Sequence, residues 1–395
     1  MASAGAALEP AGREGVAALA TAMLREGAGD LDAQAFQREL EDRSISFGVS
    51  ADRDSVSGGL RTLNIHRARA AELVALALTR PRFDADSLER VRSQLLVGLQ
   101  RQAEEPRTMA SRVFAAFAYP SHPYSRSRDE IVAGTRAASV QDARAFLAAR
   151  LARDNLLIAA CGDIAPEELG ALVDAMFGAL PATAAKDDVA EIAPAIDRAR
   201  TVVIPRRLPQ AVMLFGAGGI KRDDPDWFAG QLVNWTLGGG GFNSRLMSEV
   251  REKRGLTYGV GTFLSPSDRS ATVLGSASTE TSNAGVALDL IREEWRRMGE
   301  QGPTAEELAA AKAYLTGSFP LALDSTSSIA RLLVSIQYDR LGIDYLDRRN
   351  ALIESVTLED ARRVARRLYG GPGFLTVVVG QPDGITATDS APAVY

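Results

Sequence analysis

The chain has 395 residues, more than one core ordinarily organises, so its length predicts two domains of roughly two hundred residues each. Hydrophobic residues make up 46% and charged residues 24%, and no apolar run approaches the roughly twenty residues that cross a bilayer, so we expect a soluble globular protein without a transmembrane segment. The net charge of −5 is spread along the chain without a basic block, which excludes a nucleic-acid partner, and the single cysteine excludes a disulfide framework and a cysteine-rich zinc site.

The chain opens with a short start and an alanine-rich helix. Residues 1–10, MASAGAALEP, have neither the basic nor the apolar region of a secretion signal. The stretch GVAALATAML (15–24) predicts a helix, because alanine favours helices and the larger apolar residues recur at helical spacing. The residues that we expect to pack against a sheet are Val16, Leu19, Ala20, Met23 and Leu24.

The following elements of the first half alternate between strands and helices. ISFGVSADRDSVSGGLRTL (45–63) predicts two alternating strands around a polar turn, followed by a long helix. FDADSLERVRSQLLVGLQ (83–100) predicts a helix with an acidic first turn. DNLLIAACGDI (154–164) predicts a buried strand that ends at Gly162, so we expect Cys161 to be an inert buried thiol.

The second half repeats this order of elements at an offset of about 220 residues. Its helix GPTAEELAAAKAYLTGSF (302–319), strand PGFLTVVVGQP (372–382), strand pair 257–279 and helix WFAGQLVNWTL (227–237) each match an element of the first half. We therefore predict an α+β protein of two homologous domains, each an antiparallel sheet with helices on one face. The predicted domains are residues 1–185 and 201–395, joined by an alanine- and proline-containing linker at 186–200. Two strands precede the first helix of the second copy, whereas the first copy begins late, which leaves room for a missing leader and first strand.

Two features could suggest a binding site of another kind. The chain has 2 histidines, His66 and His122, and neither is spaced with a second metal ligand on one helical face, so we expect them to solvate or cap a helix start and to shape a loop. The run Gly238 to Gly241 lacks the Lys-Ser/Thr of a phosphate loop. We expect these glycines to end one helix before the next begins at Asn243 or Ser244.

Several stretches resemble a known family. LGGGGFNSRLMSEVREKRGLTYGVGT (237–262) and GAALEPAGREGVAALATAML (5–24), together with RPRFDADSLERVRSQ and SHPYSRS, are similar to peptidase family M16, the pitrilysin, insulysin and mitochondrial processing peptidase group, and especially to its short bacterial subfamily. The resemblance covers nearly the whole chain and implies the family's metallohydrolase fold, of the LuxS and processing-peptidase type. Because bacterial members are often exported, it leaves the compartment open between cytoplasm and periplasm.

The resemblance also implies where a zinc site would lie. Active members carry H-x-x-E-H on the opening helix, in which two histidines bind zinc and the glutamate is the general base. The corresponding positions here are Ala18, Thr21 and Ala22, and the stretch that supplies a third ligand is Val97-Gly98-Leu99. None of these side chains can replace the ligands, so we expect no metal and no cofactor in this chain.

The second half keeps a pair that active members use on the substrate. By the resemblance, Tyr258 would donate its hydroxyl near the scissile carbonyl and Arg251 would hold a neighbouring peptide carbonyl. The glycine turn, with Gly239, Gly240, Gly241 and Asn243, would border the substrate chamber. The alternative is that Arg251 is one of several exposed cations, with Arg245, Lys253 and Arg254, and that Tyr258 is a strand-edge aromatic.

These observations favour a non-catalytic subunit of a heteromeric zinc metallopeptidase. The expected partner is a homologous subunit bearing H-x-x-E-H and the zinc, in a heterodimer or larger complex that binds a peptide substrate. The alternative is a structural or peptide-binding module without a role in proteolysis, like the M16-derived core subunits of the respiratory bc1 complex. A self-sufficient hydrolase with another nucleophile has little support, because the chain has no G-x-S-x-G elbow.

Overall fold

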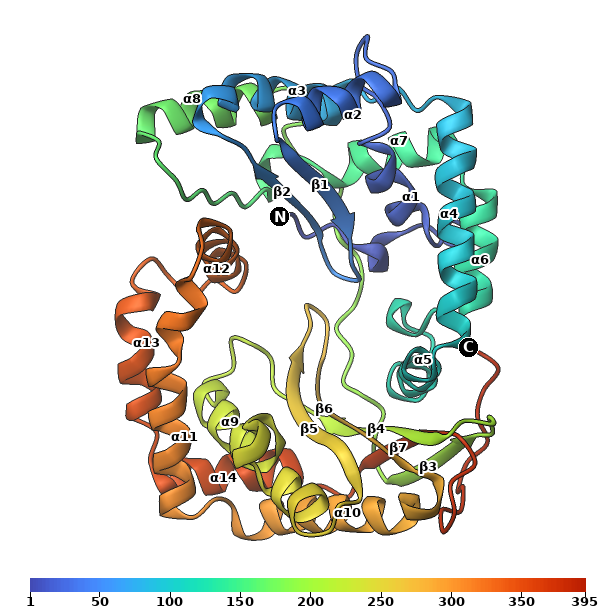
Figure 1. Ribbon diagram of the computed structural model, residues 1–395, viewed down its shortest axis with the longest axis vertical. Helices are drawn as coiled ribbons and strands as arrows, with labels where there is room; N and C mark the ends of the chain where they lie inside the picture. The colour runs from blue at the N-terminus through green and yellow to red at the C-terminus, as the bar shows by residue number, and fades with distance from the viewer. The chain divides into compact units, whose positions relative to one another are not determined.

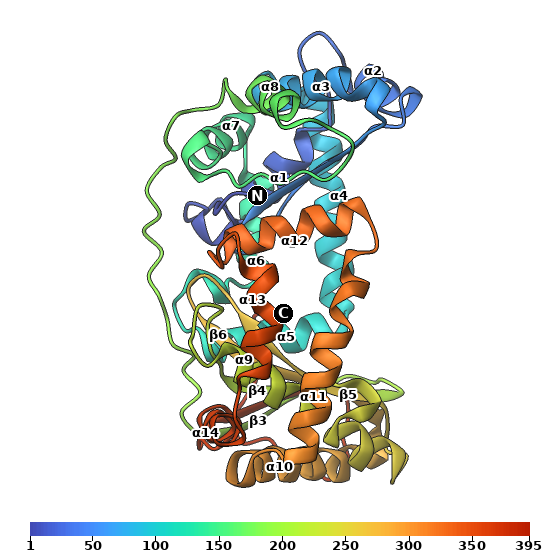
Figure 2. The same ribbon diagram turned by 90° about the vertical axis from the view of Figure 1, so that its left-hand side faces the viewer.

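The computed structural model describes all 395 residues and divides into two compact units (Figures 1 and 2). Each unit contains one segment from the other half of the chain. Unit 1 comprises Met1–Arg101, Arg128–Val189 and Leu323–Tyr338, and unit 2 comprises Gln102–Ser127, Ala190–Ala322 and Asp339–Tyr395. One boundary, between Val189 and Ala190, lies within the predicted linker. The division into two homologous domains at 186–200 rests on the sequence repeat and stays a prediction.

Unit 1 contains a two-stranded antiparallel hairpin and most of the helices of the first half. Its strands are β1 (Ser46–Ala51) and β2 (Val56–Arg61). Its helices are α1 (Val16–Met23), α2 (Ala33–Asp42), α3 (Arg67–Thr79), α4 (Ala85–Glu104, whose last turn belongs to unit 2), α6 (Arg128–Ala137), α7 (Val140–Arg150), α8 (Pro166–Phe177) and α12 (Thr326–Tyr338).

The opening helix α1 packs as predicted. Its apolar residues Val16, Leu19, Ala20 and Met23 are buried in one cluster with Val56 of the hairpin. Its N-terminus is held by a carboxylate, because Glu9 Oε1 accepts hydrogen bonds from the backbone N–H groups of Gly15, at 2.9 Å, and Ala17, at 2.8 Å. The helix is therefore a structural element of the first core.

Unit 2 is built on a five-stranded sheet of order β3-β7-β4-β6-β5. Its strands are β3 (Ala199–Ile204), β4 (Gln210–Gly218), β5 (Thr257–Pro266), β6 (Ala271–Glu280) and β7 (Phe374–Val379). Its helices are α5 (Pro106–Ala118), α9 (Trp227–Asn234), α10 (Ala284–Gln301), α11 (Ala305–Gly317), α13 (Tyr345–Glu354) and α14 (Leu358–Tyr369).

The α+β class is confirmed, but the prediction of an antiparallel sheet with helices on one face was wrong in two details for unit 2. Strand β3 pairs with β7 in parallel, whereas the other pairings are antiparallel. Helices α10 and α14 cover one face, and α5 contacts β4 and β7 from the other (Figures 1 and 2). All six residues of β7 are buried, because the strand is central and covered on both faces, which explains why its sequence FLTVVV is apolar except for Thr376. No helix of the chain combines the length and apolar character needed to cross a membrane.

The prediction of a buried strand at 154–164 was wrong. Residues 156–160 form no regular strand, most of them are half-buried, and Cys161 is also half-buried. The counterpart β7 lies between β3 and β4, whereas residues 156–160 have a single bridge, to Ala2. A strand forms only where adjacent strands supply hydrogen-bonding partners, so the apolar sequence alone does not form one here.

A cluster of ion pairs joins the β4–α9 loop to helix α14. Arg367 donates to both oxygens of Asp224, at 3.0 and 2.6 Å, and Arg363 donates to both oxygens of Asp226, at 2.9 and 2.6 Å. Hydrogen bonds from Arg367 lower the pKa of Asp224, and those from Arg363 lower the pKa of Asp226. These carboxylates therefore favour the folded state when ionised.

We expect this cluster to make unit 2 sensitive to acid. A carboxyl whose pKa is lowered by folding stabilises the fold above its unfolded pKa, about 4, and loses that contribution as the pH falls through the folded value. The melting temperature should therefore decrease when the pH is lowered below about 4. The double variant Asp224→Asn, Asp226→Asn should be less stable at pH 7 and should show a shallower decline. Parallel pH profiles for the two proteins, from thermal unfolding followed by circular dichroism, would contradict this.

Candidate functional site

The positions on α1 that correspond to the zinc motif by the resemblance offer no ligand. Thr21 is buried, and its Oγ1 donates to the carbonyl oxygens of Ala17, at 2.9 Å, and Ala18, at 3.2 Å, so the hydroxyl serves the helix itself. Ala18 and Ala22 are half-buried methyl groups, and Val97 on α4 is an exposed apolar side chain. No group of three or more His, Cys, Asp or Glu residues that could hold a metal ion occurs in the chain.

The two histidines have local roles. His122 shapes its loop as predicted: Nδ1 accepts from the backbone N–H of Tyr124 at 3.2 Å, and Nε2 lies 3.0 Å from the carbonyl oxygen of Ala190. His66 is half-buried and precedes α3, but its side chain makes no capping hydrogen bond. Of the two roles expected for His66, solvation of its side chain is therefore consistent with the structure and helix capping is not.

The glycine run allows the chain after α9 to pack closely against β5. The chain leaves α9 through a π-helical turn, Trp235–Gly239. A Cβ at Gly238 would lie 2.5 Å from Thr262 Oγ1, and one at Gly240 would lie 2.8 Å from the carbonyl oxygen of Trp235. Only glycine allows these approaches, which supports the steric interpretation of the run and not a phosphate loop.

The turn then starts the next helix. Gly241 has a φ of 56°, in the left-handed region that favours glycine, and a 3-10 turn follows through Asn243. Ser244 Oγ accepts from the backbone N–H of Met247 at 3.4 Å, so the N-cap is Ser244 and not Asn243. The helix passes into a second π-helical stretch, Met247–Glu252, that carries Arg251.

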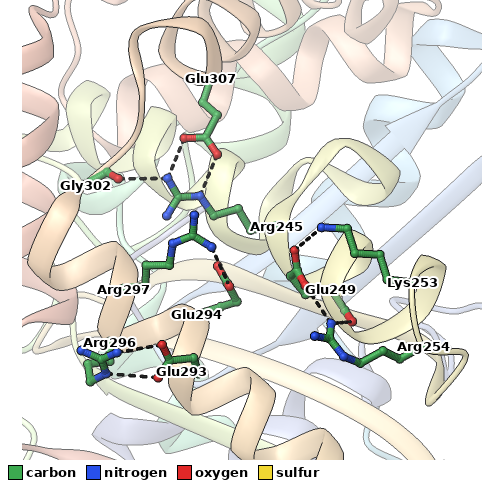
Figure 3. A network of polar contacts seen from close by, with 10 residues as sticks. All are labelled: Arg245, Glu249, Lys253, Arg254, Glu293, Glu294, Arg296, Arg297, Gly302 and Glu307. Atoms are coloured by element: carbon green, nitrogen blue, oxygen red, sulfur yellow. Dashed lines mark hydrogen bonds and ion pairs between the residues drawn. The ribbon is translucent and has the colours of Figure 1, made fainter.

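Three of the four cations in this region are engaged with carboxylates, as Figure 3 shows. Glu249 accepts from both Lys253 and Arg254, and these bonds, that of Lys253 foremost, lower the pKa of Glu249. Arg245 donates to both oxygens of Glu307, at 2.7 and 2.6 Å, and to the carbonyl oxygen of Gly302 at 3.0 Å. Its side chain is only 10% exposed, so the alternative interpretation, which counted Arg245 among the exposed cations, was wrong for this residue.

Arg251 differs from its three neighbours. It has no carboxylate partner, and its guanidinium lies 4.6 Å from the ring centroid of Phe242, which is 60% exposed. The aromatic ring holds the cation without neutralising its charge or saturating its five N–H donors. Arg251 therefore keeps its hydrogen-bonding capacity for a ligand.

Tyr258 stands on a β-bulge at the start of β5. The register passes from Thr257, opposite Thr279, directly to Gly259, opposite Ser278, so Tyr258 is the extra residue and is 77% exposed. Thr257 fixes the bulge: its hydroxyl donates to the carbonyl oxygen of Ser278 at 2.5 Å and accepts from the backbone N–H of Gly259 at 3.1 Å. The bulge turns a strand residue outward, with its hydroxyl unpaired.

The structure places Arg251 and Tyr258 at the two ends of one short turn. The backbone N–H of Gly255 donates to the carbonyl oxygen of Arg251 at 2.8 Å, and that of Leu256 donates to Val250 at 3.0 Å. Sequence reasoning missed the two supporting residues. Phe242 directly follows the glycine run and Thr257 directly precedes Tyr258, but a cation–π contact and a bulge both depend on tertiary pairing.

We expect Arg245→Ala to destabilise unit 2. Burial by itself would raise the pKa of the Glu307 carboxyl, but hydrogen bonds from Arg245 and from the Thr304 backbone outweigh burial and lower it. Removing Arg245 leaves this carboxylate with fewer partners and should cost about 2 kcal/mol of unfolding free energy. Urea denaturation measures the loss. Arg296→Ala, which removes an exposed cation paired with the exposed carboxylates of Glu293 and Glu300, is the matched control and should leave the unfolding free energy nearly unchanged; equal losses would contradict the assignment.

Comparison with known proteins agrees with this fold. A family description, "Peptidase M16 inactive domain", matches residues 137–315. The crystal structure of a peptidase M16 inactive domain from Pseudomonas fluorescens superposes with a TM-score of 0.88 at 30% identity, over 98% of this chain and 92% of that chain.

Two curated relatives extend the comparison. The non-peptidase homolog YmxG of Helicobacter pylori is 25% identical over 86% of this chain and 78% of that protein. An uncharacterized zinc protease of Streptomyces coelicolor is 28% identical over 80% of this chain and 70% of that protein. Together with the superposition and the matched inactive domain, these similarities identify the family. The chain belongs to peptidase family M16 and matches the inactive domain of that family.

Proposed function

We propose that this chain is a non-catalytic, substrate-positioning subunit of a heteromeric zinc metallopeptidase. It supplies Arg251 and Tyr258 to the active site of a homologous partner, whose H-x-x-E-H motif binds zinc and activates water. Arg251 orients the peptide through a backbone carbonyl, and Tyr258 donates its hydroxyl to the oxygen on which negative charge develops.

One observation supports this proposal above the others. Among the cations of residues 245–254, Arg251 alone is without a carboxylate partner, and it shares a short turn with an exposed, unpaired tyrosine hydroxyl. The alternative is that Arg251 only adds charge near a helix end and that Tyr258 is only a strand-edge aromatic. That alternative requires neither the contact of Arg251 with an aromatic ring nor the bulge that exposes Tyr258. The names of the relatives, which include both a non-peptidase homolog and zinc proteases, are consistent with a division of labour.

The experiment is a reconstitution with a quenched fluorescent peptide. Three samples are compared: this chain alone, an H-x-x-E-H homologue encoded beside it alone, and both mixed, with co-elution followed by size-exclusion chromatography. We expect cleavage to appear or to rise sharply only in the mixture, and to be lost on adding a chelator.

The control variants separate assembly from chemistry. Arg251→Ala should still co-elute with the homologue but fail to stimulate it, whereas Arg254→Ala, a neighbouring cation paired with Glu249, should behave as wild type. If the proteins never co-elute and mixing changes nothing, the positioning role is rejected. The protein would then be the peptide-binding or structural module of the alternative.

A further inference from the structure

Three arginines line one cavity of unit 2, which we call the arginine cavity. Its volume is about 380 Å³, within the range of small-molecule sites. No Asp or Glu lines it, although the chain as a whole has a net charge of −5. Its polar lining comes from helix α5 and from the loop that follows it, both in unit 2: Arg107, Thr108, Ser111, Arg112, Tyr124 and Arg126.

Helix α5 has two different faces. The helix contacts β4 and β7, and its buried apolar residues, such as Met109 and Val113, recur at helical spacing on one face. Thr108, Ser111 and Arg112 recur at the same spacing on the opposite face, which lines the arginine cavity. The apolar face therefore holds the helix in unit 2, and the polar face is left for a ligand.

Three side chains of the polar face carry donors that no protein group uses. Arg107 is exposed, and its guanidinium makes no hydrogen bond or ion pair. The hydroxyls of Thr108 and Ser111 make no hydrogen bond either. A hydroxyl inside a helix often donates to the carbonyl four residues earlier, as those of Thr236 and Thr316 do. The donors of the polar face are therefore available to a ligand.

The loop after α5 supplies another wall of the cavity and is held by its own contacts. Tyr124 is buried, and its hydroxyl accepts from the backbone N–H of Arg269 at 3.0 Å. His122 Nδ1 accepts from the backbone N–H of Tyr124 at 3.2 Å, and the centroids of the two rings are 4.7 Å apart. Arg126 follows two residues later, so it lines the cavity from a loop that is already ordered without a ligand.

The donors of the cavity match a phosphate group better than a carboxylate. A guanidinium presents its N–H donors in a planar fork that binds two oxygens of either anion. One such fork can already pair with both oxygens of a carboxylate. A phosphate monoester has three acceptor oxygens and a charge of about −1.5 to −2 at pH 7, so it can use several arginines and hydroxyls at once.

We propose that the arginine cavity binds a phosphate group, either of inorganic phosphate or of a small phosphate monoester. The guanidinium of Arg107 pairs with two of its oxygens, and the hydroxyls of Thr108 and Ser111 donate to the phosphate oxygens that they reach. This site is distinct from the Arg251 and Tyr258 pair and does not depend on the proposed peptidase role.

The test is isothermal titration calorimetry of the whole chain at about pH 7.5, where phosphate is mostly a dianion. Inorganic phosphate, glycerol phosphate and acetate are titrated separately at matched ionic strength. We expect saturable binding of a phosphate compound at one site per chain, and the compound that binds more tightly identifies the free ion or the monoester as the ligand. Failure of both phosphate compounds to saturate the protein by about 10 mM, or equal binding of acetate, would overturn the proposal.

Three variants locate the bound phosphate. Arg107→Ala should weaken binding at least about tenfold, because it removes a charge-assisted pair of hydrogen bonds. Arg366→Ala is the matched control and should bind like wild type, since Arg366 is an exposed arginine of α14 that has no side-chain partner and does not line the cavity. Ser111→Asp places a carboxylate among the arginines and should abolish saturable binding. Far-UV circular dichroism checks that the variants fold. Equal binding by Arg107→Ala and Arg366→Ala, or unchanged binding by Ser111→Asp, would reject this cavity as the site.

Discussion

Replacing Tyr258 by phenylalanine is expected to lower the turnover number of the reconstituted peptidase by about a hundredfold. The substitution removes one hydroxyl from a ring that is 77% exposed and that stands on a bulge fixed by Thr257, so it should leave the fold intact. A hydroxyl that donates only to the developing oxyanion affects kcat more than KM, because its bond strengthens in the transition state. Steady-state kinetics of the mixed complex measures both constants.

The matched control is Tyr314→Phe. Tyr314 is a second exposed tyrosine of unit 2, 52% exposed, and its ring lies 5.4 Å from that of Trp235, a contact that does not need the hydroxyl. This variant should keep full turnover. If Tyr258→Phe also cleaves peptide at the wild-type rate while co-eluting with the partner, the oxyanion role of Tyr258 is wrong.

Adding a methyl group at Gly238 is expected to destabilise unit 2 by about 1–3 kcal/mol. Gly238 is buried where the π-helical turn meets β5, and a Cβ there would lie 2.5 Å from Thr262 Oγ1 and 2.6 Å from Thr262 N. Because the second of these atoms is backbone, the strand itself must shift to accept the methyl group. Urea unfolding of Gly238→Ala against wild type gives the loss.

Gly259→Ala provides the comparison on the same strand. A Cβ at Gly259 would meet nothing within 4 Å, so this variant should stay within about 0.5 kcal/mol of wild type. Equal stability of the two alanine variants would show that the glycine run is not required by packing, and would reopen a ligand-binding role for the turn.

The candidate site was partly predictable from sequence. Arg251 and Tyr258, and the positions Ala18, Thr21 and Ala22 that correspond to the zinc motif by the resemblance, could be named because each set lies within one short stretch of sequence. Their roles on a substrate stay predictions. The partners that hold the pair, Phe242 under the guanidinium and Thr257 in the bulge, could not be named, since each depends on which groups meet after folding.

Charged residues show the same limit. Arg245, Arg251, Lys253 and Arg254 look alike in sequence, as four cations near a helix end. Only folding brings Glu307, 62 residues away, to Arg245 and buries that pair, while Arg251 receives an aromatic ring instead. Burial and partner choice separate a structural arginine from one that is available to a ligand.

The sequence by itself determined the α+β class, the opening helix and the two hairpins, because helical and strand periodicities and turn residues act over a few positions. The family followed from the resemblance of whole motifs, such as residues 237–262. The sequence also established that no zinc ligands stand on α1, since side-chain chemistry needs no coordinates. The tertiary structure decided that residues 156–160 form no strand although their counterpart β7 does, and that α5 joins the sheet of unit 2. Strand pairing and helix docking depend on neighbours that are distant in sequence, and local apolar character cannot supply a missing neighbour.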